Sequence, residues 1–124
     1  MALVAVCAAG AAQAGTVESA ILDGRKITVT LHEFMSSEES QTLRLAMSNK
    51  DVLAVFLAGQ EGHGALAISP DEGFIRNGQI VTSAVAMAGL PDIGAARAAA
   101  LQGCEAKRKG PSDCVVVLEI SPAS

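Results

Sequence analysis

The stretch Asp92–Ile120, DIGAARAAALQGCEAKRKGPSDCVVVLEI, carries the clearest local pattern of the chain. Asp92 is a typical N-cap residue, and the alanine-rich segment after it predicts a helix running to about Lys109. Gly110, followed by a proline, predicts a left-handed stop. The branched apolar residues of Cys114–Ile120 predict a last buried strand, on which the small helix residues can pack closely. This end of the chain therefore predicts a helix lying on a sheet.

The segment upstream of this end adds three further elements. Lys26–His32 alternates strictly between apolar and polar residues, which is typical of a half-buried strand. Ser36 and Glu39 have the spacing of a capping box, which predicts a helix over residues 37–48. Val52–Ala58 is a short, continuous apolar run, and we interpret it as a central strand buried on both faces.

The middle of the chain is rich in turn residues. Ala65–Ser69 reads as a strand after a glycine-rich loop. Asn77-Gly78, between two short apolar pairs, predicts a type I′ hairpin over residues 74–81. Thr82–Gly89 fits either a strand or a loop, and its sequence does not decide between them.

These elements predict the fold class. With the 74–81 ribbon set aside, the order is strand, helix, strand, strand, helix, strand. This order favours an α+β fold with a small antiparallel sheet and two helices on one face, as in a ferredoxin-like β-α-β-β-α-β plait with an extra hairpin. A chain of 124 residues fits a single domain.

Composition and motifs argue against several functions. The net charge of −4 and the absence of Trp and Tyr disfavour nucleic-acid binding, which needs a basic face and stacking platforms. No serine lies in a G-x-S-x-G elbow, and the glycines of residues 59–64 lack a P-loop lysine. The sequence thus offers no catalytic residue and no cofactor site, and it favours a protein that is not an enzyme.

The first residues resemble a targeting segment. Met1–Ala14 is apolar and alanine-rich and ends in Ala12-Gln13-Ala14, a small-x-small cleavage pattern. We predict a signal peptide over residues 1–14, a mature domain over 15–124, and a periplasmic or secreted location. No Lys or Arg precedes the apolar run, and a buried N-terminal helix or strand of a cytosolic protein stays the alternative. The run is too short for a stable membrane span, which needs about 20 apolar residues.

The chain has three cysteines. Removal of the leader takes away Cys7 and leaves Cys104 and Cys114, with nine residues between them. In an oxidising compartment a bridge would join the end of the last helix to the start of the last strand. In the cytosol the same cysteines would more often be reduced core residues.

The histidines are the candidates for a metal or catalytic site. His32 lies on the polar side of a strand and reads as a solvated residue. His63 lies in the GQEGHG loop two residues after Glu61, with Asp71 and Glu72 beyond the next strand. A loop site at Glu61 and His63 is therefore conceivable. Zinc needs three or four ligands, and the sequence lacks the usual ligand spacings, so no metal ligand is assigned.

The C-terminal half, over roughly residues 60–120, resembles a family of small exported bacterial domains of unknown function. Those domains combine an alanine-rich helix ending in Leu-x-x-Cys with a second cysteine that enters a valine-rich strand. The resemblance implies export and a Cys104–Cys114 disulfide, and it carries no activity. The chain departs from the family in lacking its aromatic residues and further cysteines. The matching residues are Ala98, Ala99, Ala100, Leu101, Cys104, Cys114, Val115, Val116 and Val117.

Three functional hypotheses follow. The first is an exported, non-enzymatic domain that binds a protein or envelope partner, with the extra hairpin presenting a loop. The second is a protease inhibitor or propeptide-like module, which offers an edge strand or the tail 121–124 to a protease. The third is a metal-binding protein that uses His63.

Overall fold

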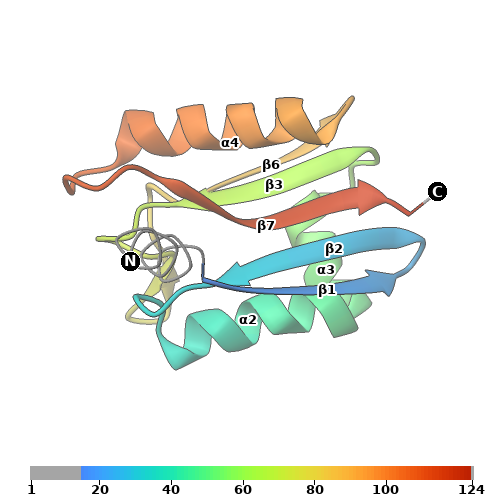
Figure 1. The fold of residues 1–124 in the computed structure, drawn as a ribbon, viewed down its shortest axis with the longest axis horizontal. Helices are drawn as coiled ribbons and strands as arrows, with labels where there is room; N and C mark the ends of the chain where they lie inside the picture. Colours follow the sequence, from blue (N-terminus) through green and yellow to red (C-terminus); the bar gives the residue numbers. More distant parts are fainter. Residues whose placement is uncertain (1–14, 124) are drawn as a thin grey trace, which may run out of the picture.

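The computed structural model describes residues 15–123 and has the predicted α+β class. Runs of strands are separated by helices along the chain, and Figure 1 shows the elements coloured from blue to red. In chain order the elements are β1 (Thr16–Leu22), β2 (Arg25–Leu31), α2 (Ser37–Ser48), α3 (Lys50–Leu57), β3 (His63–Ile68), β4 (Ile75–Arg76), β5 (Gln79–Ile80), β6 (Val85–Leu90), α4 (Ile93–Lys107) and β7 (Val115–Pro122).

The main sheet has five strands in the order β1-β2-β7-β3-β6, and all neighbours are antiparallel. Strand β1 is absent from the sequence prediction. It pairs with β2 through a turn in which Asp23 (φ 54°) and Gly24 (φ 74°) are both left-handed. An Asp-Gly pair between alternating segments is a hairpin signal, so the sequence did contain the information for β1.

The prediction of a central strand over Val52–Ala58 is wrong, because this run forms helix α3. Asn49 ends α2 and caps α3 in turn, since its side chain accepts the N–H groups of Asp51 (2.9 Å) and Val52 (3.2 Å). The buried residues Leu53 and Leu57 are four apart, which is helical spacing. A short apolar run does not distinguish a strand from a buried helix by periodicity alone.

The predicted N-terminal caps of α2 and α4 are confirmed, but the predicted C-terminal stop of α4 is not. The capping box of Ser36 and Glu39 is present at α2, and Asp92 accepts the N–H of Ala95 at 2.8 Å at the start of α4. The prediction that Gly110 stops the last helix is wrong. Helix α4 ends at Lys107, and its C-cap Arg108 has extended backbone (φ −65°, ψ 147°).

The predicted type I′ hairpin is confirmed in the β4–β5 ribbon. Asn77 (φ 56°) and Gly78 (φ 74°) are both left-handed, as this turn requires. The undecided stretch 82–89 contributes to strand β6, which pairs with β3 and is the second edge of the sheet.

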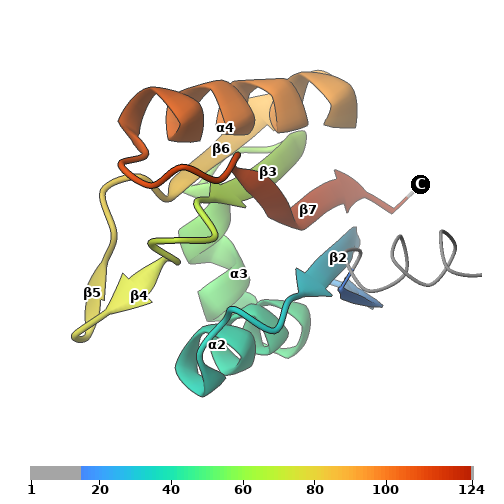
Figure 2. The same cartoon turned by 60° about the vertical axis from the view of Figure 1, so that its left-hand side comes forward.

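The helices lie on both faces of the sheet, so the prediction of two helices on one face is wrong, and with it the ferredoxin-like arrangement. Strand β3 accounts for this, because it is buried on both sides: Leu66 packs in the core with α2 and α3, and Ala67 packs in the core with α4. Figure 2 shows α4 on one side of the sheet and α2 and α3 on the other.

Helix α4 packs against β3, β6 and β7. On the same side of the sheet, Val17 and Ile21 of β1 stay 60% and 64% exposed. Among residues 15–123 no helix combines the length and apolar character needed to cross a membrane.

Candidate functional site

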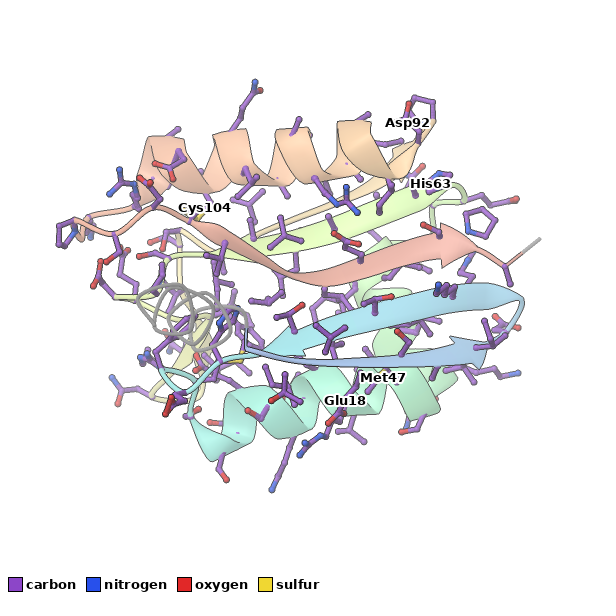
Figure 3. All side chains as sticks on the ribbon, viewed as in Figure 1. Glu18, Met47, His63, Asp92 and Cys104 are labelled. Carbon is purple, nitrogen blue, oxygen red and sulfur yellow. A yellow bond between two sulfur atoms is a disulfide. The ribbon has the colours of Figure 1, made fainter. Side chains whose placement is uncertain are left out.

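The two C-terminal cysteines form a disulfide. The sulfur atoms of Cys104 and Cys114 are 2.02 Å apart, and their Cα atoms are 6.2 Å apart. Both residues are buried, at the end of α4 and just before β7. The bridge therefore fixes the only helix that covers this side of the described sheet to its central strand β7 (Figure 3).

The predicted loop site at Glu61 and His63 does not gather further ligands. His63 begins β3 opposite Leu90 of β6, and its buried Nδ1 has no hydrogen-bond partner within residues 15–123. Glu61 is exposed in the preceding loop. In the described part of the chain, no three His, Cys, Asp or Glu side chains are placed to hold a metal ion together. His63 is labelled in Figure 3 at the end of the sheet near Asp92.

His32, which the sequence suggested to be solvated, stacks on Phe34 with ring centroids 4.9 Å apart. Partial burial lowers the pKa of its imidazole. His32 therefore makes an aromatic contact just after β2, and within residues 15–123 its side chain forms no hydrogen bond with an acidic side chain.

Glu72 binds the backbone of the loop that follows α4. Its Oε2 accepts the N–H groups of Lys109 (2.7 Å) and Gly110 (3.0 Å), and its Oε1 accepts the hydroxyl of Ser83 (2.8 Å). These donors, led by the N–H of Lys109, lower the pKa of Glu72 to about 2. The same bonds hold the backbone after Arg108, where the sequence had suggested a glycine stop.

Two further carboxylates hold the same loop. Asp71 accepts the N–H of Ser112 at 2.9 Å, and Glu105 accepts the N–H of Cys114 at 2.7 Å. Both acids stabilise the backbone of the disulfide loop. The sequence gave no signal for these contacts, because each joins segments that are distant along the chain or lie across a turn.

Glu39 is the one fully buried carboxylate in the described chain. It accepts the N–H groups of Ser36 (2.9 Å), Phe74 (2.7 Å) and Ile75 (2.8 Å), and Arg76 lies 3.0 Å away. Burial raises its pKa, but the backbone donors and Arg76 outweigh burial and leave the pKa below its usual value. Glu39 thus fixes the β4–β5 ribbon to the start of α2.

A hollow of about 870 Å³ lies where β1 begins and β2 ends. It is bordered by Gly15, His32, Phe34, Pro70 and Asp113, among others. Gly15, the first described residue, borders this hollow, and the predicted signal peptide over residues 1–14 lies outside the described residues. The hollow alone therefore does not define a ligand site.

An apolar groove opens between α3, the β4–β5 ribbon and β6. Its volume is about 160 Å³, and no polar side chain lines it. Two of its walls are exposed: Val55 of α3 is 76% exposed, and Ile80 of β5 is 68% exposed. We call this site the α3–ribbon groove. Its lining residues are Val55, Phe56, Leu66, Phe74, Ile80, Ala84 and Ala86.

The structure defines the class of the protein as an α+β domain with a disulfide-braced helix and an apolar surface groove. No protein-family model, curated protein or solved structure matches the chain.

Proposed function

We propose that this chain is an exported, non-enzymatic protein-binding domain and that the α3–ribbon groove receives an apolar anchor side chain of its partner. The observation that carries the proposal is the groove itself. Val55 and Ile80 are the two most exposed large apolar side chains in residues 15–123, and both line it. Exposed apolar patches of this kind are typical of protein contact sites.

The volume and the apolar lining of the groove favour a protein side chain, rather than a small molecule, as its occupant. Small-molecule pockets usually enclose about 300–1,000 Å³ and carry a few polar groups for orientation. The groove measures about 160 Å³ and has only apolar lining. It therefore suits one aliphatic or aromatic side chain of a protein segment, the kind of anchor that dominates many interfaces.

The ribbon that forms one wall is held firmly. Glu39 binds the N–H groups of Phe74 and Ile75, and the Phe74 carbonyl accepts the N–H of Val81 at 2.9 Å. A preorganised wall lowers the entropy lost on binding. This supports the hypothesis that the extra hairpin serves recognition.

Export is supported by two features. The apolar leader with its small-x-small end is typical of a signal peptide. The Cys104–Cys114 bridge suits an oxidising compartment such as the periplasm or the extracellular space.

A non-enzymatic role is supported by the use of the acidic side chains. Glu39, Asp71, Glu72 and Glu105 all accept backbone N–H groups. Carboxylates that already accept such bonds are poorly suited to act as general bases.

Two elements of the other hypotheses, the inhibitory tail and the metal site, have less support. Ser121 and Pro122 belong to β7, and the N–H of Ala123 donates to the Gly24 carbonyl at 2.9 Å, so the chain up to Ala123 is not a free inhibitory tail. Ser124 lies outside the described residues. The metal hypothesis rests on His63, and no three His, Cys, Asp or Glu side chains of the described residues are placed to hold a metal ion together.

A displayed library of random peptides, selected against the oxidised protein, tests the groove. We expect selected peptides to share one large apolar residue and to lose binding to an Ile80→Asp variant. The matched control is Ile21→Asp, because Ile21 is 64% exposed and Ile80 is 68% exposed, but Ile21 lies on β1. Peptides that bind both variants equally well, or that share no apolar anchor, would refute the groove as the binding site.

A further inference from the structure

The two edges of the main sheet are built differently. All seven residues of β1 pair with β2 in one continuous register. At the other edge, β6 has a register shift in its pairing with β3, near Gly89 (φ 79°). Bulges blunt an edge against further strand pairing, and a long regular edge remains open to it. Within residues 15–123, the open edge of this sheet is therefore β1.

The side chains of β1 do little to protect that edge. Val17 and Ile21 are 60% and 64% exposed on the side of the sheet that α4 covers elsewhere. The one charged residue of β1, Glu18, is already bound by Arg44 of α2 through two hydrogen bonds of 3.1 and 2.9 Å. Edge strands that stay monomeric usually carry an unpaired charge, a proline or a bulge.

We propose that two copies of this chain pair through β1, antiparallel and around a two-fold axis at Ser19, so that their sheets become continuous. The proposal does not depend on the α3–ribbon groove, because β1 and β6 lie at opposite edges of the sheet.

The sequence of β1 is self-complementary in this register. Val17 lies opposite Ile21 of the second copy, and Glu18 lies opposite Ala20 of the second copy. Pairs of branched apolar residues stabilise antiparallel strands, and the small alanine leaves room for the Glu18–Arg44 ion pair.

The neighbouring two-fold registers fit less well. An axis at Glu18 sets two Glu18 carboxylates directly opposite each other, which is destabilising. An axis at Ala20 sets Val17 against Asp23 of the second copy. Among these three registers, only the axis at Ser19 places Val17 opposite Ile21 and keeps the two Glu18 carboxylates apart.

The helix layer beneath β1 fits the same arrangement. Helix α2 packs against both β1 and β2, so it lies beneath this pair of strands. With strands about 4.8 Å apart, the two α2 axes would be separated by two strand spacings, about 10 Å. This matches the spacing of about 8–10 Å at which helices pack. The sheet and the α2 layer can therefore both continue across the two-fold axis at Ser19.

Sedimentation velocity of the oxidised protein across the micromolar range tests the proposal. An interface of one strand and one helix per copy is at the small end of specific interfaces, so we expect a concentration-dependent monomer–dimer equilibrium. Val17→Lys should weaken the dimer at least about tenfold, since it places a lysine in the apolar pair. Val55→Lys is the control, because Val55 is similarly exposed but lies on α3.

A cysteine at the axis gives a second, geometric readout. In a Cys7→Ser background, Ser19→Cys should form disulfide-linked dimers under mild oxidation, since each Ser19 faces its own copy. Ser37→Cys, an exposed position at the start of α2, should not.

Three results would overturn the proposal: a monomer at every concentration, a dimer that Val17→Lys leaves intact, or equal cross-linking at positions 19 and 37. The Ile80→Asp variant should dimerise normally. Failure of the groove and failure of the β1 dimer are therefore distinguishable.

Discussion

The two faces of the sheet are stabilised in different ways. Under α2 and α3 the core consists mainly of large side chains such as Leu43, Leu53, Phe74 and Ile120. Under α4 it consists of alanines and the two cysteines, with partly buried residues such as Leu101 at its border. Small side chains let a helix approach a sheet closely, but each buries little apolar area, and burial contributes about 25 cal/mol per Å². The α4 face therefore depends on a covalent bridge, whereas the face under α2 and α3 depends on packing.

The largest effect is expected from a cavity on the packed face. Leu43 is fully buried, so Leu43→Ala should lower the free energy of unfolding by about 2–5 kcal/mol. Leu101→Ala, at a partly buried position of α4, is the matched change on the other face and should cost less. Urea unfolding of the two variants measures the difference. An equal loss at both positions would show that the two faces are packed alike.

Loss of the disulfide should be next in size. The double variant Cys104→Ala and Cys114→Ala should lower the free energy of unfolding by about 2–3 kcal/mol, because the bridge no longer restricts the unfolded chain. Hydrogen exchange should reveal the loss first in α4, while α2 keeps its protection. Uniform loss of protection in both helices would contradict a special dependence of the α4 face on the bridge.

The cap of α4 should contribute less. Asp92 accepts the N–H of Ala95 at 2.8 Å, so Asp92→Ala should cost about 1 kcal/mol in thermal or urea unfolding. Asp92→Asn keeps an acceptor at this position and is the control. If Asp92→Asn proves as destabilising as Asp92→Ala, the cap hydrogen bond is not the source of the effect.

The smallest effect is expected in the stability of the protein at acidic pH, through the bonds of Glu72 to the loop beside the disulfide. The folded pKa of Glu72 is about 2, below its ordinary value of 4.5, so its contribution is present above pH 4.5 and is lost as pH falls through about 2. The stability difference between the protein and Glu72→Gln should therefore shrink from pH 5 to about pH 2. Urea unfolding at several pH values measures it. A difference that stays constant with pH would contradict the carboxylate role.

Local signals in the sequence predicted part of this structure. Asn77-Gly78, the Ser36–Glu39 box and the Asp92 cap each act within a few residues, and all three are confirmed. The disulfide was indicated by cysteine number and by resemblance, and its geometry is present.

Other parts depend on tertiary context. The run Val52–Ala58 carries no polar residue to mark its exposed side, and only the Asn49 cap distinguishes it as a helix. The sequence predicts that α4 ends at Gly110, but the helix ends at Lys107. The backbone after Arg108 is bound by Glu72, which is distant in sequence, so no local pattern predicts this end. The α3–ribbon groove joins Val55 to Ile80 and Ala86, and no local pattern predicts that these segments meet.

We propose that this domain is exported and that its disulfide forms in an oxidising compartment. The most direct test is the intact mass of the protein recovered from its native host, measured with and without reduction and thiol alkylation. For an exported protein we expect a chain that begins at Gly15 and in which two thiols become reactive only after reduction. A full-length chain with three free thiols would contradict it.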